Sequence, residues 1–276
     1  SPGGKAGARP DRAVIVYCNR IREAYGDIPI IIGGLEASLR RFAHYDYWDD
    51  KIRRSILFDS QADLISYGMG EKQTVEIAER LRNGELISDL TDIRGTCYAC
   101  DVKDTPLSGA ESPSYENVVA SKKEYAVSCR IQQDEQDHIR GKLIKQRHGN
   151  RMLIQNPPMP PLTTQELDEI YALPFMRTYH PSYEEKGGVP GIEEVRFSIT
   201  HNRGCFGGCN FCSIAFHQGR MVRSRSHESI LEEAKKLTMH PDFKGYKGSS
   251  EYEYRRKWCR CNHRRTTSKQ MHWPPR

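Results

Sequence analysis

Three closely spaced cysteines near the C-terminal end constrain this chain more than any other feature. Cys205, Cys209 and Cys212 have the spacing C-x3-C-x2-C, and Gly207 and Gly208 lie between the first two. A loop that brings three thiolates to one point needs backbone freedom, which glycine provides because it has no Cβ. Three thiolates on one short loop suit a soft metal or an iron–sulfur cluster. We therefore expect Cys205, Cys209 and Cys212 to hold one [4Fe–4S] cluster, with one iron left open to a small molecule.

The residue before the third cysteine is the aromatic Phe211, and with it the motif resembles the signature of the radical S-adenosylmethionine (SAM) enzymes. The resemblance implies that the open iron binds SAM. It further implies that an electron cleaves SAM to a 5′-deoxyadenosyl radical, which abstracts a hydrogen atom from a substrate. In such chemistry the protein contributes ligation, orientation and exclusion of solvent. An electron donor such as flavodoxin or ferredoxin is implied as a partner.

The same resemblance predicts which residues contact SAM. Phe211 would lie beside the adenine, and Gly207 and Gly208 would leave room for the methionyl group. A guanidinium pairs with a carboxylate through two hydrogen bonds, so an arginine after the loop would bind the SAM carboxylate. The candidates are Arg220, then Arg223 and Arg225. Solvated surface arginines are the alternative.

The sequence around the motif has the pattern of one β/α unit. Residues 194–200 alternate apolar and polar side chains, which predicts a strand. Ser226 can cap a following helix, which Pro241 ends. This order predicts the first β/α unit of the superfamily's partial barrel, in which chemistry takes place at the C-terminal ends of the strands. A unit takes ~30 residues, so residues 193–246 hold one unit and the start of another.

A closer resemblance is carried by long runs of sequence from residue 1 to about 246. Two runs are Tyr17-Cys-Asn-Arg-Ile-Arg-Glu-Ala-Tyr25 and Ile32-Gly-Gly-Leu-Glu-Ala-Ser-Leu-Arg-Arg41, and others lie at 1–7, 9–12, 43–48, 53–56, 67–71, 92–97 and 216–220. They resemble the YgiQ-type bacterial radical SAM family. The resemblance implies cluster and SAM chemistry on an unknown substrate.

Residues 247–276 depart from that resemblance. They contain no Ala, Val, Ile, Leu or Phe, so they have almost nothing to bury and are predicted to be a disordered tail from outside the family. The barrel would be truncated after its first unit. We therefore expect an incomplete enzyme that cleaves little or no SAM by itself.

The N-terminal part is predicted to be α/β. Short apolar runs at 13–17, 29–32 and 62–67 predict buried parallel strands, with helices at 19–25 and 73–82, in a doubly wound sheet. A hairpin is predicted around residues 142–154, and Thr163 with Glu166 forms a capping box. The expected divisions are a sheet domain (1–160), a helix and linker (161–192), the barrel start (193–246) and the tail (247–276). The sequence lacks Asp-x-His-x-x-Gly, so cobalamin is not predicted.

The formal charge of +6 gives no support for nucleic-acid binding, because residues 247–276 alone carry nine Lys or Arg against two Glu. The nine cysteines are clustered and odd in number, which favours a reduced cytoplasm over disulfides. Cys97 and Cys100 form a second C-x2-C, either a redox pair or auxiliary ligands, or ordinary half-buried thiols. No membrane partner is predicted.

Several alternatives remain open at this stage. The run His44–Asp50 combines aromatics and acids that would either line a substrate cleft or form a loop with packed aromatics and exposed acids. The three motif cysteines would instead bind zinc in an interaction module if His201 or His217 supplied a fourth ligand. A third interpretation is that the chain is a non-catalytic fragment of a longer protein.

Overall fold

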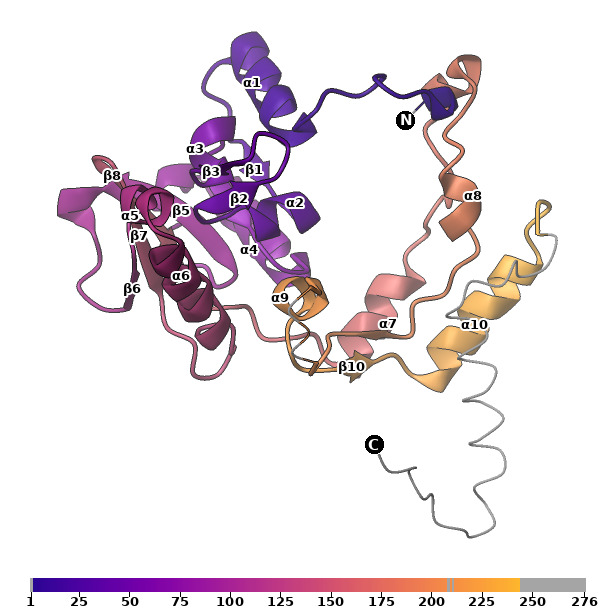
Figure 1. Ribbon diagram of the computed structural model, residues 1–276. Helices are drawn as coiled ribbons and strands as arrows, with labels where there is room; N and C mark the ends of the chain where they lie inside the picture. The colour runs from indigo at the N-terminus through magenta and orange to yellow at the C-terminus, as the bar shows by residue number, and fades with distance from the viewer. Residues whose placement is uncertain (1, 208, 210, 244–276) are drawn as a thin grey trace, which may run out of the picture.

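The computed structural model describes residues 2–207, 209 and 211–243. A sheet domain occupies the chain to about residue 156, and a more open segment carrying α7, α8 and α10 follows it (Figure 1). The sheet has six strands in the order β1-β4-β5-β8-β7-β6. They are β1 (Ile31–Ile32), β4 (Leu64–Ser66), β5 (Thr96–Asp101), β8 (Arg151–Gln155), β7 (Ile144–His148) and β6 (Ala110–Ser112). The predicted α/β class is confirmed.

The sheet is mixed, whereas the sequence suggested a doubly wound sheet of parallel strands with one hairpin. Only β1 with β4 and β6 with β7 pair in parallel, and the other neighbours are antiparallel. The predicted hairpin is β7–β8, and Gly149 in its turn has a φ of 62°. A tight two-residue turn permits only antiparallel pairing, which explains this part of the difference.

The helices of the sheet domain are α1 (Ala13–Tyr25), α2 (Gly34–Leu39), α3 (Ile56–Ser60), α4 (Glu71–Arg82), α5 (Tyr115–Ala120) and α6 (Lys122–Asp134). The predicted strand at 13–17 is wrong, because these residues form the first turns of α1. Short apolar runs do not distinguish a buried strand from a helix by periodicity. Here the run continues into the helix predicted at 19–25, so α1 buries Cys18 and packs Val14 and Ile15 on the core.

The core has two layers because neighbouring residues of a strand face opposite sides of a sheet. Ile65 packs with the cluster under α1, α2 and α3, which also contains Phe42 and Leu153. Leu64, the preceding residue, faces the smaller cluster formed with Ile77 of α4. Helices therefore cover both faces of the sheet, as the sequence predicted for this domain.

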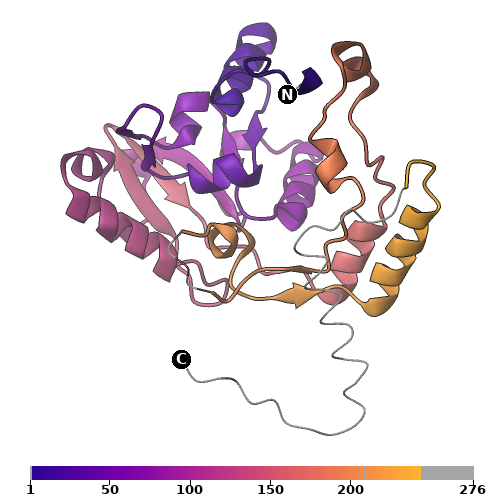
Figure 2. The same cartoon turned by 45° about the vertical axis from the view of Figure 1, so that its right-hand side comes forward.

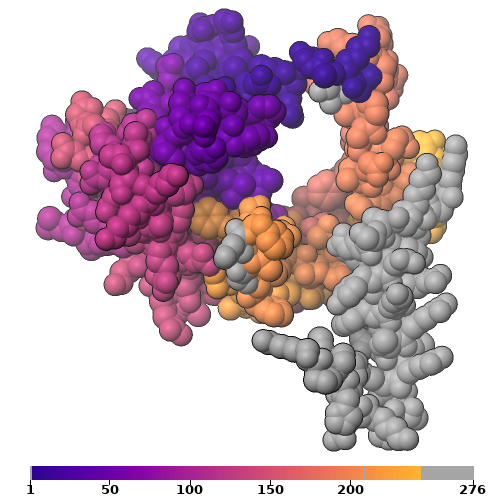
Figure 3. Space-filling view, viewed as in Figure 1, coloured from indigo at the N-terminus to yellow at the C-terminus, as the bar shows by residue number. Residues whose placement is uncertain are grey.

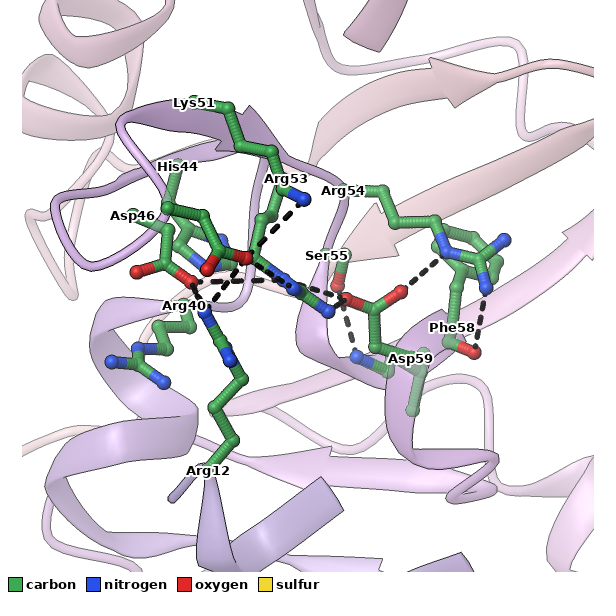
Figure 4. Close-up of polar contacts among 12 residues, drawn as sticks. Arg12, Arg40, His44, Asp46, Lys51, Arg53, Arg54, Ser55, Phe58 and Asp59 are labelled. Carbon is green, nitrogen blue, oxygen red and sulfur yellow. Dashed lines mark hydrogen bonds and ion pairs between the residues drawn. The ribbon is translucent and has the colours of Figure 1, made fainter. Parts of the chain in front are cut away.

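An ion network fixes a small hairpin, β2 (His44–Asp46) and β3 (Lys51–Arg53), against the start of α1 (Figure 4). Arg12 donates two hydrogen bonds to buried Asp46, at 3.0 and 2.7 Å, and pairs with Asp49 at 2.8 Å. Asp59 pairs with Arg53 at 2.7 Å. The run His44–Asp50 thus matches neither alternative: its acids 46 and 49 are paired, and its aromatics Tyr45, Tyr47 and Trp48 are exposed.

The second part of the chain contains α7 (Thr164–Ala172), η4 (Pro181–Lys186), α8 (Ile192–Val195), α9 (Ile214–Gln218) and α10 (His227–Thr238). The predicted capping box of Thr163 with Glu166 and the Ser226 cap are both present. Helices α7 and α10 lie side by side in both ribbon views (Figures 1 and 2). The Gly3 amide donates to the Gly188 carbonyl at 2.7 Å, so the first residues reach η4 and close a ring around an opening (Figure 3).

The described helices include none that is both long enough and apolar enough to cross a membrane. The predicted tail at 247–276 lies outside the described residues.

His148 gives the sheet domain a defined sensitivity to acid. Its ring is buried between Phe58 and Tyr115, with centroid distances of 4.8 and 5.5 Å. Its Nε2 donates to the Gln146 Oε1 atom at 3.1 Å, which leaves Nδ1 buried without a partner. Burial lowers the pKa of His148 from 6.5 to about 4, because a charged ring would lose its water.

We predict that the protein loses stability as the pH falls from about 6.5 through about 4. In this range His148 is protonated in the unfolded chain but stays neutral in the folded protein. The loss attributable to His148 is about 3 kcal/mol. Denaturant unfolding between pH 7 and 4 should have a smaller pH slope in His148→Phe. The exposed His227→Gln variant is the control and should keep the parent slope. An unchanged slope in His148→Phe would contradict the assignment.

Candidate functional site: the cysteine loop and its cleft

The cysteine loop (residues 205–213) is enclosed by a two-stranded ribbon. Strands β9 (Asn202–Arg203) and β10 (Arg223–Ser224) pair antiparallel on either side of it. The strand predicted at 194–200 is therefore wrong: α8 covers residues 192–195 and no strand is found from 196 to 201, all of which are described.

The apolar residues of the 194–200 run are accommodated differently. A parallel barrel strand needs a neighbouring strand to accept its backbone hydrogen bonds, and no described strand lies beside this segment. Phe197 instead packs edge-on against the rings of His240 and Phe243, at 5.5 and 5.4 Å. Val195 of the same run is 56 % exposed, so the alternation does not mark a buried face.

Glycine at position 204 is required by the geometry of the ribbon. Gly204 has a φ of 83°, and a Cβ there would lie 2.2 Å from the Met221 carbonyl oxygen. The Gly204 amide donates to the Gln218 Oε1 atom at 3.0 Å, and the Cys205 amide donates to the Gly219 carbonyl at 3.1 Å. These bonds join the start of the cysteine loop to the end of α9.

The sulfur atoms of Cys205 and Cys209 approach the same glycine. A Cβ on Gly207 would lie 3.3 Å from the first sulfur and 3.9 Å from the second. The Gly207 amide also donates to the Cys205 sulfur at 3.3 Å. Gly207 has no positive φ, so the backbone freedom that the sequence suggested is not used here, and a Cβ would be tight only against the Cys205 sulfur. Gly208 lies outside the described residues.

The donor set suits a cluster, although its geometry is incomplete. All three thiols are free of disulfides, and Cys209 is exposed. The Cys212 amide donates to the Cys209 carbonyl at 3.1 Å, which closes a tight turn. Within residues 2–207, 209 and 211–243, however, no three His, Cys, Asp or Glu side chains are arranged to hold a metal. Three free thiols are suitable ligands for an iron–sulfur cluster, and two of the sulfurs, those of Cys205 and Cys209, lie near the same residue, Gly207.

The two histidines considered for a zinc site lie in different settings. His217 belongs to α9, and its Nδ1 is buried without a partner. Burial, with Arg41 and Arg203 nearby, lowers the pKa of His217. The His201 carbonyl accepts the Arg225 amide at 2.9 Å. In the described part of the chain neither histidine joins the cysteines in a metal-binding group.

The residues predicted to contact SAM do not converge. Phe211 is 93 % exposed, and Arg220 and Arg223 are exposed without an ion partner in the structure's described part. Arg225 is buried: it pairs with Glu233, donates to Ser229 and lies 4.3 Å from the centre of the Tyr171 ring. Arg225 thus stabilises the start of α10 and is not free to bind a carboxylate, which corrects that candidate.

Arg41 joins α9 to the sheet domain, and the sequence analysis missed it. Its side chain is fully buried, and its guanidinium lies 4.1 Å from the centre of the Phe216 ring. Gln136 accepts from Arg41 at 3.3 Å and donates to the Phe216 carbonyl at 2.7 Å. In the sequence, Arg40 and Arg41 look like any surface pair, so no local signal identified this residue.

A shallow cleft that is open to solvent lies between the β4–α4 turn and the base of the cysteine loop. Its chemistry is set by Met69, Glu71, Arg203, His217, Arg220 and Arg223, and we call it the arginine cleft. Gln218 and Gly219, whose oxygens accept the amides at the start of the cysteine loop, also line it. The cleft and the loop therefore share a wall.

Cys97 and Cys100 do not form a redox pair. They lie three residues apart on β5, so their side chains face opposite sides of the sheet, about 10 Å apart along the strand. Cys97 is in the core, where burial raises its pKa to about 12. The reading as ordinary thiols is the one that the fold supports.

The family of the chain is shown by comparison with known sequences. The family model described as Radical SAM N-terminal matches residues 1–198, most of the chain. The chain belongs to this family.

Its relatives include bacterial proteins named UPF0313 protein. One from Clostridium botulinum (strain ATCC 19397 / Type A) is 54 % identical over 272 residues, which is 98 % of this chain and 42 % of the relative. One from Clostridium perfringens (strain ATCC 13124) is 51 % identical over 279 residues, 97 % of this chain and 42 % of the relative. The chain thus spans about two-fifths of the length of these relatives. Both alignments extend past residue 246, and the division at 247 stays a prediction.

We predict that Gly204→Ala opens the β9–β10 ribbon, since its φ of 83° and the Met221 oxygen both exclude a Cβ. A non-glycine residue in the left-handed region costs about 1–2 kcal/mol, so the Cys205 amide should exchange about tenfold faster with deuterium. Gly191→Ala is the control, because no atom lies within 4 Å of its added Cβ. Equal protection of Cys205 in both variants would contradict this role.

Proposed function

We propose that this chain carries the cluster-binding and SAM-binding loop of a radical SAM enzyme. The observation that supports it best is that the sulfurs of Cys205 and Cys209 both lie close to Gly207 on the three-thiol loop. Membership of the Radical SAM N-terminal family supports the same reading. When bound, a [4Fe–4S] cluster would supply the electron that cleaves SAM to a 5′-deoxyadenosyl radical, for hydrogen abstraction from a substrate.

The residues of this chain would bind and orient the cofactors. Cys205, Cys209 and Cys212 would be the cluster ligands, and the missing side chain at Gly207 keeps their sulfurs free to approach one metal centre. Gly207 and Gly208 would leave room for the methionyl group of SAM. The exposed Phe211 ring is available to an adenine, and the unpaired Arg220 is available to the SAM carboxylate.

The partners are part of the proposal. A flavodoxin or ferredoxin would supply electrons to a loop that is reachable from solvent at Cys209. The substrate would enter beside the same loop. Since the relatives are more than twice as long, we expect the complete activity to need residues beyond those of this chain, which by itself should release little 5′-deoxyadenosine.

We predict that anaerobic reconstitution with iron and sulfide gives one [4Fe–4S] cluster per chain, seen as absorbance near ~400 nm. Single Cys→Ser changes at 205, 209 and 212 should each abolish most of it, because each removes a ligand. Cys129→Ser, an exposed cysteine on α6, should load normally. Stoichiometric zinc without iron would favour a zinc-binding interaction module instead.

We also predict that the reconstituted chain binds SAM through the cluster, and calorimetry can measure it. Cys209→Ala should lower SAM affinity at least about tenfold, since the cluster would supply the main contacts. Arg220→Gln should weaken binding less, through loss of a carboxylate partner. Full SAM affinity in Cys209→Ala would rule out binding at an open iron. Weak SAM binding with a full cluster would instead assign the chain as a non-catalytic fragment.

A further inference from the structure

The arginine cleft contains positive charge that cluster ligation does not use. Of its lining residues only Glu71 is acidic, and Glu71 is already paired with Arg203. Lys72, also in the lining, pairs with Glu166 at 2.8 Å. Arg220 and Arg223 therefore leave the cleft with a net positive mouth.

Arg223 is the less expected of these two cations. It lies directly opposite Arg203 in the β9–β10 ribbon, so the two side chains project from the same face about 5 Å apart at Cβ. Like charges opposite each other destabilise a strand pair. Glu71 neutralises the charge of Arg203 in an ion pair, whereas Arg223 has no carboxylate within ion-pair distance among the residues that the structure describes. A bound anion would relieve this repulsion.

The cleft also has an unsatisfied polar atom and an apolar wall. The Nδ1 atom of His217, a lining residue, is buried, and none of the described residues forms a hydrogen bond with it. An unpaired buried ring nitrogen is costly, and a ligand that donates or accepts there would remove the cost. Met69, Met159 and Met221 line the same space. Methionines form adaptable contacts with flat apolar groups.

We propose that the arginine cleft binds an anionic small molecule with an apolar body, its negative head on Arg223 and its body against the three methionines. Because Gln218 and Gly219 both line the cleft and bond the start of the cysteine loop, this molecule is placed as the substrate class of that site. The role as substrate rests on the proposed function, but the binding itself does not. The competing outcome is a pair of solvated arginines beside an empty apolar surface.

The test uses the full chain without added iron, so that it does not depend on the cluster. Calorimetry would compare 1-naphthyl phosphate and 1-naphthoate with neutral 1-naphthol and with inorganic phosphate. We expect the two anions to bind at least about tenfold more tightly than naphthol, and more weakly as salt is raised. The stronger of the two anions identifies the head group as phosphate or carboxylate. Equal binding of naphthol would overturn the proposal.

Variants and methyl resonances locate the binding. Arg223→Gln should abolish the preference for anions without lowering the melting temperature. Arg223→Lys should keep part of that preference, and Arg130→Gln on α6 should leave it unchanged.

Methyl resonances test the same site independently. With 13C-methyl methionine, naphthyl phosphate should shift the methyl resonances of Met69, Met159 and Met221. Shifts confined to Met152, Met176 and Met239, or full affinity in Arg223→Gln, would overturn the site. Loss of cluster loading with intact anion binding would count against the proposed function alone.

Discussion

A buried cation, Arg41, which has no carboxylate partner among the described residues, lies at the junction of the sheet domain and the cysteine loop. Removing a guanidinium from water costs several kcal/mol unless its donors and its charge are accommodated. Arg41 donates to the side-chain oxygens of Gln155 and Gln136 and to the Ser38 carbonyl, and its charge lies over the rings of Tyr67 and Phe216. Burial lowers the pKa of Arg41. These partners come from β8, α2, the β4–α4 turn, the end of α6 and α9.

The contacts of Arg41 determine where α9 and the cysteine loop lie on the sheet domain. The oxygens and rings around Arg41 converge only if β4, β5 and β8 are adjacent, as the sheet order makes them. Phe216 of α9 is then held on the sheet domain, and α9 in turn supplies the Gln218 and Gly219 acceptors of the cysteine loop. A sheet of otherwise general α/β type thereby fixes one side of a thiol loop in the second part of the chain.

Two arginines near β10 illustrate how the fold separates structural from available charge. Arg225 is enclosed by Glu233, Ser229 and the Tyr171 ring, and it ties the start of α10 to α7. Arg223, two residues earlier, lines the arginine cleft opposite Arg203, and no acid of the described residues neutralises it. The same residue type therefore stabilises the fold at one position and offers a binding charge at the other. This difference is the basis for proposing an anionic ligand in the arginine cleft.

The sequence alone determined the features that depend on neighbouring residues. The C-x3-C-x2-C spacing, the capping box at Thr163, the Ser226 cap and the turn of the β7–β8 hairpin follow from short-range backbone and side-chain chemistry, and all but the metal geometry are seen. The family membership was also contained in the sequence, in its long matching runs.

Only the tertiary structure decided the features that depend on distant partners. Residues 13–17 became helix because α1 packs on the core, and residues 194–200 formed no strand because no neighbouring strand lies beside them. The burial of Arg41, the pairing of Arg225 and the exposure of Arg223 each rest on contacts with residues that are remote in the sequence or across the ribbon. Local periodicity reports which residues prefer burial, but the partner that buries or neutralises a side chain is set by chain topology.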